Sequence, residues 1–551
     1  MSEMIDSAPR PTRRAFVTGI AAVGAAAAVA RPALAKEASA PADAPEGFDA
    51  HGSSARPVAE AAETRKHQVV VVGAGAAGLM AADHLADYGL DVCLLEKGSS
   101  TSVSNFSLCG GPNACETRLQ EQEGEWVSLK QMYQYMYGFS NGSVNAGLLK
   151  SILAGTGPCI DRMLDLGIEM ELWGDPYGTG FRGRHYLISE GEERTQPIVD
   201  DIVSKGGTVV TSADVYAILR DDDGTVIGVQ ADVDGVVTDV TADATIVCTG
   251  GFIGNSTMQR ERFNTTVFPL GNTVSDGTGI QMILNAGGVL DRQFSVLGNE
   301  CGAVSPATTG WPFTAEWRNV NEHLGYWLFG GLFVDATGRR FCDEGRVAQL
   351  PLAYGGEVLT RAGHAWVVMD SDYYEGVQDK GIWEFLGKPE SWTAGEENGF
   401  YSPDPTVADE HLKQAIDEGW GMRADTIDEI AEKFGLDQLP ETIEAYNSYC
   451  DSGEDAEFYK DPAFLKPVAK APFYAFEYVP SAWGTNGGVK VDSCLRAVDE
   501  ENVAIPGLYV AGVDCGSMYT QPYYTNPGAS VGNAMGSGWA VAEQVAAQLG
   551  K

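Results

Sequence analysis

The chain has 551 residues, of which 44% are hydrophobic and 21% charged, so it can bury a large core in roughly two to four domains. Acidic residues outnumber basic ones by 76 to 37, for a formal charge of −39. This balance argues against nucleic acid and anionic membrane surfaces as partners, favours solubility and is compatible with a cationic protein partner.

The first 35 residues have the features of an export signal. Pro11 to Val17 contains a twin-arginine pair, Ala15 to Ala30 is a short apolar segment, and Ala33-Leu34-Ala35 has the A-x-A cleavage pattern. The apolar segment is short and weakly apolar for a membrane anchor. We therefore expect twin-arginine export to the periplasm or the extracytoplasmic face. Residues 36–66 are rich in Ala, Pro, Glu and Ser and predict a disordered linker.

Residues 67–98 predict a dinucleotide-binding unit: a buried strand, the G-x-G-x-x-G spacing of Gly73, Gly75 and Gly78, a helix, and a second buried strand that ends at Glu96. Gly73 permits the tight turn, Gly75 lets a pyrophosphate approach the backbone, and Gly78 lets the helix pack on the sheet. Glu96 is placed to accept the ribose hydroxyls. This unit alone leaves NAD and FAD open.

Further elements follow in chain order. After a loop that contains Gly110 and Gly111, residues 126–170 predict helices, and residues 207–240 alternate as in a small antiparallel sheet. An apolar strand at 244–247 enters Cys248-Thr249-Gly250-Gly251-Phe252, and residues 275–290 form a Gly-rich turn that opens a helix. Residues 503–512 predict a strand that ends on glycine, and residues 526–535 open a last helix that runs to about Leu549.

The ten cysteines are scattered through the chain without any C-x-x-C or C-x-x-C-H spacing. This argues against c-type haem and against the usual iron–sulfur and zinc spacings, so no metal ligand is predicted. Whether cysteines distant in sequence assemble a cluster stays open.

Four segments together resemble the FAD subunit of the fumarate reductase/succinate dehydrogenase superfamily. They are the N-terminal V-V-V-G-A-G-A-A-G, the C-T-G-G-F segment, the C-terminal I-P-G-L-Y-V-A-G and the Gly-rich start of the last helix. The resemblance covers residues 67–550 and favours FAD over NAD. It implies an α/β fold, with a split Rossmann-type FAD-binding domain in residues 67–299 and 441–551. An α+β capping domain would be inserted at 300–440, with the substrate between cap and flavin.

The resemblance carries cofactor contacts onto this chain. An acid is usual in the family at Thr278, and Asp276 is an uncertain substitute. No histidine is marked as an attachment point, so we expect non-covalent FAD. The residues expected at the cofactor are Gly73, Ala74, Gly75, Ala77, Gly78, Glu96, Lys97, Gly110, Gly111, Thr249, Gly250, Gly251, Gly277, Gly512, Asp514, Ser530, Ala534 and Met535.

The substrate-binding positions depart from fumarate reductases. Gly484 and Ala529 stand where those enzymes have a histidine and a carboxylate-clamping arginine, which makes a C4 dicarboxylate an unfavourable substrate. The spacing of Tyr524, Gly528 and Ala529 resembles 3-ketosteroid dehydrogenases instead, in which the tyrosine hydroxyl and the glycine N–H hold a substrate carbonyl oxygen.

The proton-transfer residue of the family follows R-F-x-[ND]-E by a few positions. That motif is Arg340 to Glu344 here, but the usual position holds Ala348. Arg346 and Tyr354 are the two alternatives, and a surface ion pair is an equally good interpretation of Arg346.

These residues predict an exported flavin enzyme that reduces a C=C bond conjugated to a carbonyl. The electrons would come from a separate cytochrome or quinol-linked protein, since no haem or cluster motif is present in the chain. The reverse, ketosteroid-type dehydrogenation, a fumarate reductase-like activity and an electron-transfer flavoprotein are the alternatives.

Overall fold

The computed structural model describes residues 53–174, 179–263, 267–269, 271–292, 295–297, 300–303, 331–349, 354–380, 385–386, 408–520, 523, 526 and 528–551. The predicted export signal and Tyr524 lie outside these residues.

A six-stranded sheet, in the order β19-β20-β10-β2-β3-β6, carries the dinucleotide motif. Its strands are β2 (Val69–Val72), β3 (Val92–Leu95), β6 (Thr208–Val210), β10 (Ala244–Val247), β19 (Arg496–Val498) and β20 (Ala504–Val510), all parallel except β19. Strands β2, β3 and β10 are buried along their whole length, as expected for a parallel sheet covered on both faces. The sheet joins strands from both ends of the chain, which confirms the predicted split α/β domain.

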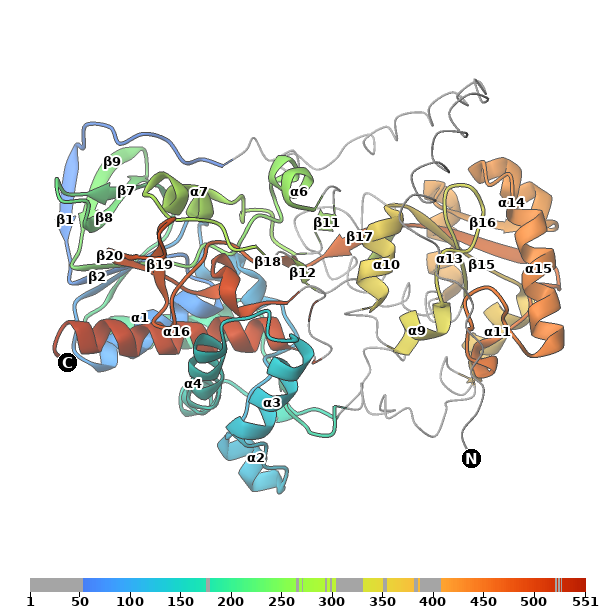
Figure 1. The fold of residues 1–551 in the computed structure, drawn as a ribbon, viewed down its shortest axis with the longest axis horizontal. Coiled ribbons are helices and arrows are strands. Elements are labelled where there is room, and N and C mark those ends of the chain that lie inside the picture. Colours follow the sequence, from blue (N-terminus) through green and yellow to red (C-terminus); the bar gives the residue numbers. More distant parts are fainter. Residues whose placement is uncertain are drawn as a thin grey trace, which may run out of the picture. The chain divides into compact units, whose positions relative to one another are not determined.

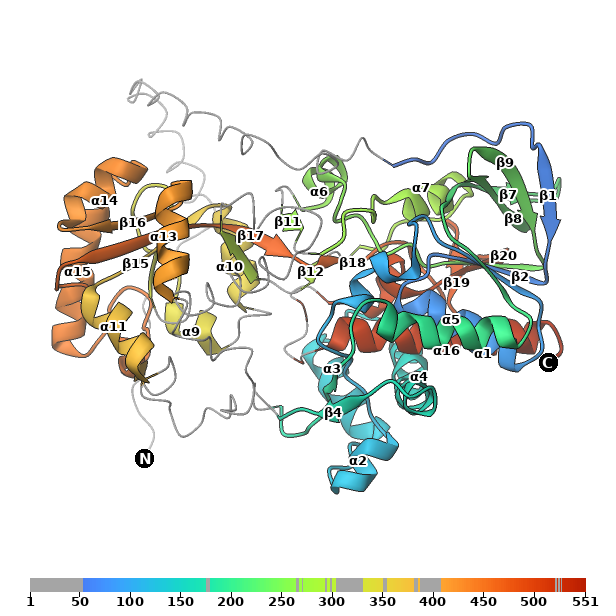
Figure 2. The same cartoon turned by 180° about the vertical axis from the view of Figure 1, so that it is seen from behind.

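Helices pack beside this sheet. Helix α1 (Ala76–Asp87) contacts α16 (Ala529–Gln548), which in turn contacts α4 (Ala146–Asp165), while α5 (Glu192–Ser204) also contacts α1 (Figure 1, Figure 2). Small residues in α1 and α16 permit the close approach, since a side chain at Gly538 would collide with the backbone of Ala77. The remaining helices of this part are α2 (Arg118–Glu123), α3 (Leu129–Phe139), α6 (Ser256–Phe263) and α7 (Thr278–Asn285), and β4 (Met170–Leu172) pairs with β5 (His185–Leu187).

The predicted antiparallel sheet is present as β7 (Ala213–Arg220), β8 (Val226–Val233) and β9 (Val236–Thr241), but it has a fourth strand, β1 (Glu63–Lys66), parallel to β9. The prediction of a disordered linker is therefore wrong for residues 53–66. Ala62 donates a backbone hydrogen bond to Val237 O at 2.9 Å, and Ala59 donates one to Gln230 Oε1 at 2.7 Å. An edge strand of polar residues has no apolar periodicity that could identify it.

A second core surrounds β17 (Phe473–Ala482), which pairs with β11 (Phe268–Pro269), β13 (Glu300–Ala303), β15 (Ala365–Met369) and β16 (Gly421–Ala424). The strand β14 (Leu332–Val334) pairs with β15, and β12 (Ser295–Leu297) pairs with β18 (Gly484–Asn486). The described residues of this part contain the helices α9 (Glu344–Gln349), α10 (Gly356–Ala362), α11 (Ser371–Lys380), α13 (Ala408–Glu418), α14 (Ile427–Phe434) and α15 (Leu439–Ser452).

The predicted end of the cap at residue 440 is too early for this core. Ile443 and Tyr446 of α15 and Ala475 of β17 are buried in one apolar cluster with Leu332 and Val368. Residues 441–482, assigned above to the second part of the FAD-binding domain, therefore pack with the described cap residues instead.

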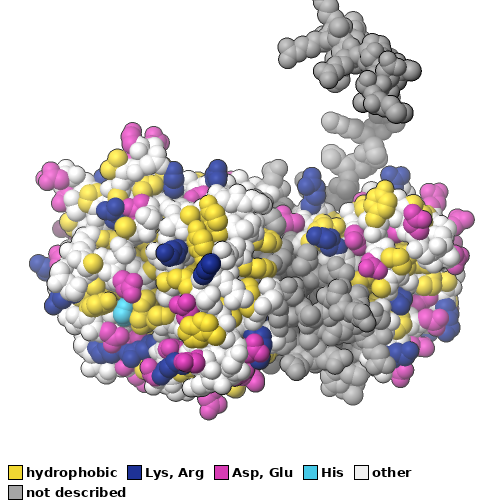
Figure 3. All heavy atoms as spheres, turned by 60° about the horizontal axis from the view of Figure 1, so that its bottom comes forward, with side chains coloured by type: hydrophobic (Ala, Val, Ile, Leu, Met, Phe, Trp, Pro, Cys, Tyr) yellow, Lys and Arg dark blue, Asp and Glu magenta, His cyan; other side chains and the backbone are white. Residues whose placement is uncertain are grey.

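Figure 3 shows acidic and basic side chains interspersed over one face of the molecule. Among the helices of the described residues, none combines the length and the apolar character that a bilayer crossing requires.

Candidate functional site

A cavity lies where the carboxyl ends of β2, β10 and β20 meet, at the edge of a parallel sheet where cofactors bind. It draws residues from each of the predicted motifs. Twelve of the predicted site residues line it: Gly73, Gly75, Ala77, Glu96, Gly110, Gly111, Thr249, Gly250, Gly512, Gly528, Ser530 and Ala534.

The glycines of the first motif have different surroundings. A Cβ at Gly73 would lie 2.5 Å from Cys248 O, and a Cβ at Gly78 would overlap Gly73 O. At Gly75 the nearest atom would be Ser104 Cβ, 3.9 Å away, so space remains in front of this backbone. Gly75 is also the N-cap of α1 and offers no capping side chain. The motif therefore presents helix N–H groups to an open cradle that suits a pyrophosphate.

Glu96 closes this end of the cavity. Its carboxylate accepts hydrogen bonds from the backbone N–H of Ala74 and of Gly98, each at 2.7 Å. The side chain is buried, and this burial raises its pKa. Both oxygens retain lone pairs, so an oriented carboxylate faces the cavity where a ribose would lie. Ala74 thus acts through Glu96 and does not line the cavity itself.

Asp514 is fully buried and does not line the cavity. Its Oδ2 accepts from the N–H of Thr249 and, at 2.8 Å, from the Thr249 hydroxyl, while Oδ1 accepts from the N–H of Gly251 at 2.8 Å. Burial raises the pKa of this carboxyl. Asp514 and Gly251 therefore position the loop that follows β10, and the cavity is lined by Thr249 and Gly250.

Lys97 also has a protein partner. Its Nζ lies 2.7 Å from Asp276 Oδ2, while Asp276 Oδ1 accepts from the N–H of Thr278 at 3.0 Å. The pair joins the end of β3 to the start of α7, which follows Gly277. Three further predicted cofactor residues do not line the cavity, namely Gly78, Gly277 and Met535.

The sequence spacing predicted that these positions lie near the site, but it did not predict the direction of each side chain.

The other end of the cavity is formed by Gly110, Gly111 and the start of α16. Gly528, at φ +77°, is the N-cap of α16, and a Cβ there would collide with Gly111 O. Asn113 N–H donates to Gly528 O at 2.9 Å, and the N–H of Ser530 donates to the Tyr523 hydroxyl at 2.7 Å. Tyr523 lines the cavity. Its neighbour Tyr524, the predicted carbonyl-binding residue, lies outside the described residues.

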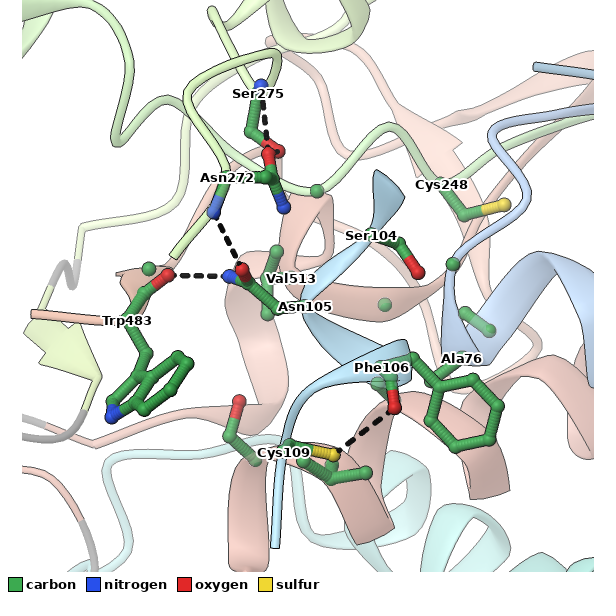
Figure 4. Close-up of a pocket in the computed structure, with 18 of the residues that line it drawn as sticks. Ala76, Ser104, Asn105, Phe106, Cys109, Cys248, Asn272, Ser275, Trp483 and Val513 are labelled. Atoms are coloured by element: carbon green, nitrogen blue, oxygen red, sulfur yellow. Dashed lines mark hydrogen bonds between the residues drawn. The ribbon is translucent and has the colours of Figure 1, made fainter. Parts of the chain in front are cut away.

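Sequence reasoning missed several lining residues. Asn105 bridges two chain segments, since its Oδ1 accepts from Asn272 N–H at 2.8 Å and its amide donates to Trp483 O (Figure 4). Cys109 and Arg184 also line the cavity. Single polar residues in loops have no periodicity or spacing that could have identified them.

Arg346 and Tyr354 lie together within the described cap residues, and neither lines the cavity. The Arg346 guanidinium carbon is 5.5 Å from the centre of the Tyr354 ring, and Arg346 is exposed. Burial raises the pKa of Tyr354. Just before them, Arg340 forms a buried ion pair with Glu344 at 2.8 Å and with Asp455 at 2.8 Å. This network fixes the start of α9, the helix that carries Arg346.

The residues present fit FAD. The cradle at Gly75 and the carboxylate of Glu96 suit its ADP half, and the backbone of Gly110, Gly111 and Gly250 lies open along the same cavity for its flavin half.

Comparisons with known proteins agree with this fit. The family model described as FAD binding domain matches residues 68–531, so the chain belongs to this family. The chain is 27% identical to the vinyl phenol reductase of Lactiplantibacillus plantarum, over 86% of this chain and 94% of that protein. It is also 27% identical to the digoxin reductase of Eggerthella lenta, over 87% of each. Fumarate reductases and 3-oxosteroid 1-dehydrogenases are further relatives.

Among solved structures, the 3-ketosteroid Δ1-dehydrogenase of Sterolibacterium denitrificans shares the fold with a TM-score of 0.65 and 17% identity, over 88% of this chain and 100% of that one. The family match and the relatives together confirm the resemblance to the fumarate reductase/succinate dehydrogenase superfamily. The cofactor is FAD, and the protein is a flavin-dependent oxidoreductase of the class that acts on CH–CH bonds.

Proposed function

We propose that the protein reduces a C=C bond conjugated to a carbonyl group. The observation that carries the proposal is the position of Gly528, the N-cap of α16, which lines the FAD cavity beside Gly111. A helix N-terminus presents N–H groups and the positive end of the helix dipole. A donor at this point stabilises the oxyanion that forms on a carbonyl when its conjugated C=C bond accepts a hydride.

FAD, when bound and reduced, would supply the hydride that the β-carbon accepts. Gly528 N–H and the Tyr524 hydroxyl, assigned from the sequence spacing, then hold the carbonyl oxygen as negative charge develops on it. We assign proton delivery to the α-carbon to Arg346 or Tyr354 from the sequence motif alone, since neither lines the cavity among the described residues. The names of the relatives support a reductase, and the ketosteroid-type dehydrogenation, which uses the same groups in reverse, is the second candidate.

Fumarate is expected to be a poor substrate. Gly484 lines the cavity and Ala529 is buried, and neither carries the charge that a second carboxylate needs. Each lost charged contact is worth about 1.5–3 kcal/mol, so two together weaken turnover by roughly three orders of magnitude.

The signal-like N-terminus supports export by the twin-arginine pathway, with FAD bound non-covalently before export. An exported enzyme has no access to cytoplasmic NADH, so we propose a separate protein as the electron donor. Purified enzyme reduced by a viologen is therefore expected to turn over enones and enoates, whereas NADH alone leaves its flavin oxidised. Rapid reduction by NADH would contradict the proposed donor, and a lack of turnover with every conjugated acceptor would contradict the proposed reaction.

A further inference from the structure

Arg184 is the one cationic side chain among the described residues that line the FAD cavity. It directly precedes β5 and pairs with Asn113 in an isolated β-bridge. The same strand is tied to the glycine segment of the cavity, since Leu187 N–H donates to Gly110 O at 3.2 Å and His185 N–H donates to Pro112 O at 2.8 Å. Arg184 therefore has a fixed backbone position beside Gly110 and Gly111.

The guanidinium of Arg184 is also oriented. Its Cζ lies 4.2 Å from the centre of the Trp173 ring, and Trp173 stacks on Tyr186 at 4.7 Å with an angle of 8° between the rings. The N–H of Trp173 donates to Arg184 O at 2.9 Å, which holds the two residues together. Stacking on an aromatic ring restricts a guanidinium without neutralising its charge.

Gly110 makes room for this side chain. A Cβ at Gly110 would lie 2.5 Å from Arg184 Nη2, so any other residue there would displace the guanidinium. Gly110 does not have a positive φ, so its backbone conformation does not demand glycine. Close approach of Arg184 is therefore one physical reason for glycine at this position, beside the open backbone that Gly110 presents to the cavity.

The charge adjoins Gly110, in the glycine segment that we assign to the flavin half of FAD. The ADP end is marked by Gly75 and Glu96, with Ser104 next to Gly75. Arg184 instead adjoins Gly110, whose neighbour Gly111 adjoins Gly528, the proposed carbonyl-binding residue. The pyrophosphate belongs with the N-terminus of α1, so the anion considered for the Arg184 side of the cavity is one that the substrate carries.

We propose that Arg184 selects an α,β-unsaturated monocarboxylate as the substrate, with its guanidinium bound to the carboxylate. This inference rests on the proposed function. Reduction of an enone places one negative charge on its oxygen, which neutral donors stabilise. Reduction of an enoate adds a second negative charge to a group that already carries one, and this requires a cation. A planar guanidinium matches a carboxylate with two parallel hydrogen bonds, and Phe106, Trp483 and Tyr523 supply an aromatic lining for a conjugated substrate.

The test compares an acid with its amide. The flavin spectrum of the oxidised holoenzyme is titrated with 3-phenylpropanoate and with 3-phenylpropanamide, and kcat/KM is measured for cinnamate and cinnamamide with a reduced viologen. The variants are Arg184→Gln, Arg184→Lys and, as a control, Arg496→Gln, which changes an arginine that pairs with Asp492 and does not line the cavity. The reduction potential of bound FAD is recorded for each.

The parent enzyme is expected to bind the acid more tightly than the amide. Arg184→Gln weakens acid binding by roughly ten- to one-hundred-fold and leaves amide binding unchanged. Arg184→Lys retains part of the preference for the acid, because lysine keeps the positive charge but cannot make the two parallel hydrogen bonds of a guanidinium. Arg496→Gln leaves the affinity for the acid and for the amide unchanged.

Equal weakening of acid and amide, or an unchanged preference for the acid, would overturn the assignment. An altered flavin potential with unchanged acid binding would assign the cation to the reduced flavin instead. If acid binding depends on Arg184 but no conjugated acceptor is reduced, whether acid, amide or cyclic enone, the proposed reaction fails and the anion site stands. If enones are reduced with no preference for acids, the reaction stands and the anion site fails.

Discussion

The carboxylate of Asp514 accepts hydrogen bonds from both the backbone N–H and the hydroxyl of Thr249, although 265 positions separate the two residues in the chain. Thr249 follows β10 in the first part of the FAD-binding domain, and Asp514 follows β20 in the second. One buried carboxylate therefore joins the two parts of the split domain at the edge of the cavity, and the walls of the site form only when both parts have folded together.

The substitution Asp514→Asn tests this link. Both carboxylate oxygens are acceptors, so an amide in either orientation directs its NH2 group at a backbone N–H, which costs about 1–3 kcal/mol for a buried donor. We expect lower FAD content and a lower thermal midpoint. Asp222→Asn, at an exposed position, is the control and should leave both unchanged. Parent-like FAD content and midpoint in Asp514→Asn would show that the link is dispensable.

Two glycines of the first motif should respond differently to alanine. Gly75 has an ordinary negative φ of −78°, and its Cβ would face free space beside Ser104. Gly75→Ala should therefore fold but bind FAD poorly, because the methyl group occupies the place of the pyrophosphate. Gly78→Ala would overlap Gly73 O and should reduce soluble yield. Circular dichroism and FAD content measure the two effects. A Gly75→Ala variant with full FAD content would refute the proposal that the backbone at Gly75 holds the pyrophosphate.

We expect the buried His185 to make the protein less stable at acid pH. Its Nδ1–H donates to Gly183 O at 3.0 Å, so Nε2 accepts from the Thr117 hydroxyl at 2.9 Å and the ring is neutral. Burial lowers its pKa from 6.5 to about 4. Because the unfolded chain binds this proton more readily, stability is present above pH 6.5 and is lost as the pH falls toward 4, by at most about 3 kcal/mol.

The measurement is the thermal midpoint of the holoenzyme between pH 7.5 and pH 4.5, for the parent and for His185→Gln. The thermal midpoint of His185→Gln should be lower than that of the parent at pH 7.5, but it should fall by less on acidification. Parallel pH profiles for the two proteins would mean that another group governs the acid limit.

We expect the hydroxyl of Tyr523 to contribute to stability and the hydroxyl of Tyr524 to contribute to catalysis. Tyr524→Phe should lower kcat by roughly 10²–10³ with unchanged FAD content, because it removes only the proposed donor to the carbonyl oxygen. Tyr523→Phe removes the acceptor of the Ser530 N–H at the start of α16 and should therefore lower the thermal midpoint. If Tyr524→Phe turns over within a few-fold of the parent while Tyr524→Ala loses its flavin, Tyr524 is a packing residue.

The dinucleotide unit could be predicted from sequence because its strands, helix and glycines repeat at fixed spacings over few residues. The strand β1 could not, because polar residues at a sheet edge have no apolar pattern. The assignment of residues 441–482 to the wrong core has a related cause, since local periodicity identifies α15 but not the sheet on which it packs. Asp514 and Lys97 were located near the site, but their roles depend on partners such as Thr249 and Asp276 that lie far away in the chain.

The most direct test of the proposed reaction is anaerobic reoxidation of the reduced flavin. Enzyme reduced with one equivalent of dithionite is mixed with cinnamate, cinnamamide, a cyclic enone or fumarate, and flavin absorbance is followed as the saturated product is quantified. We predict that conjugated mono-carbonyl acceptors restore the oxidised spectrum with one equivalent of saturated product, and that fumarate reacts slower by about three orders of magnitude. A flavin that stays reduced with all these acceptors but is reoxidised by an oxidised cytochrome would contradict the account and identify an electron-transfer flavoprotein.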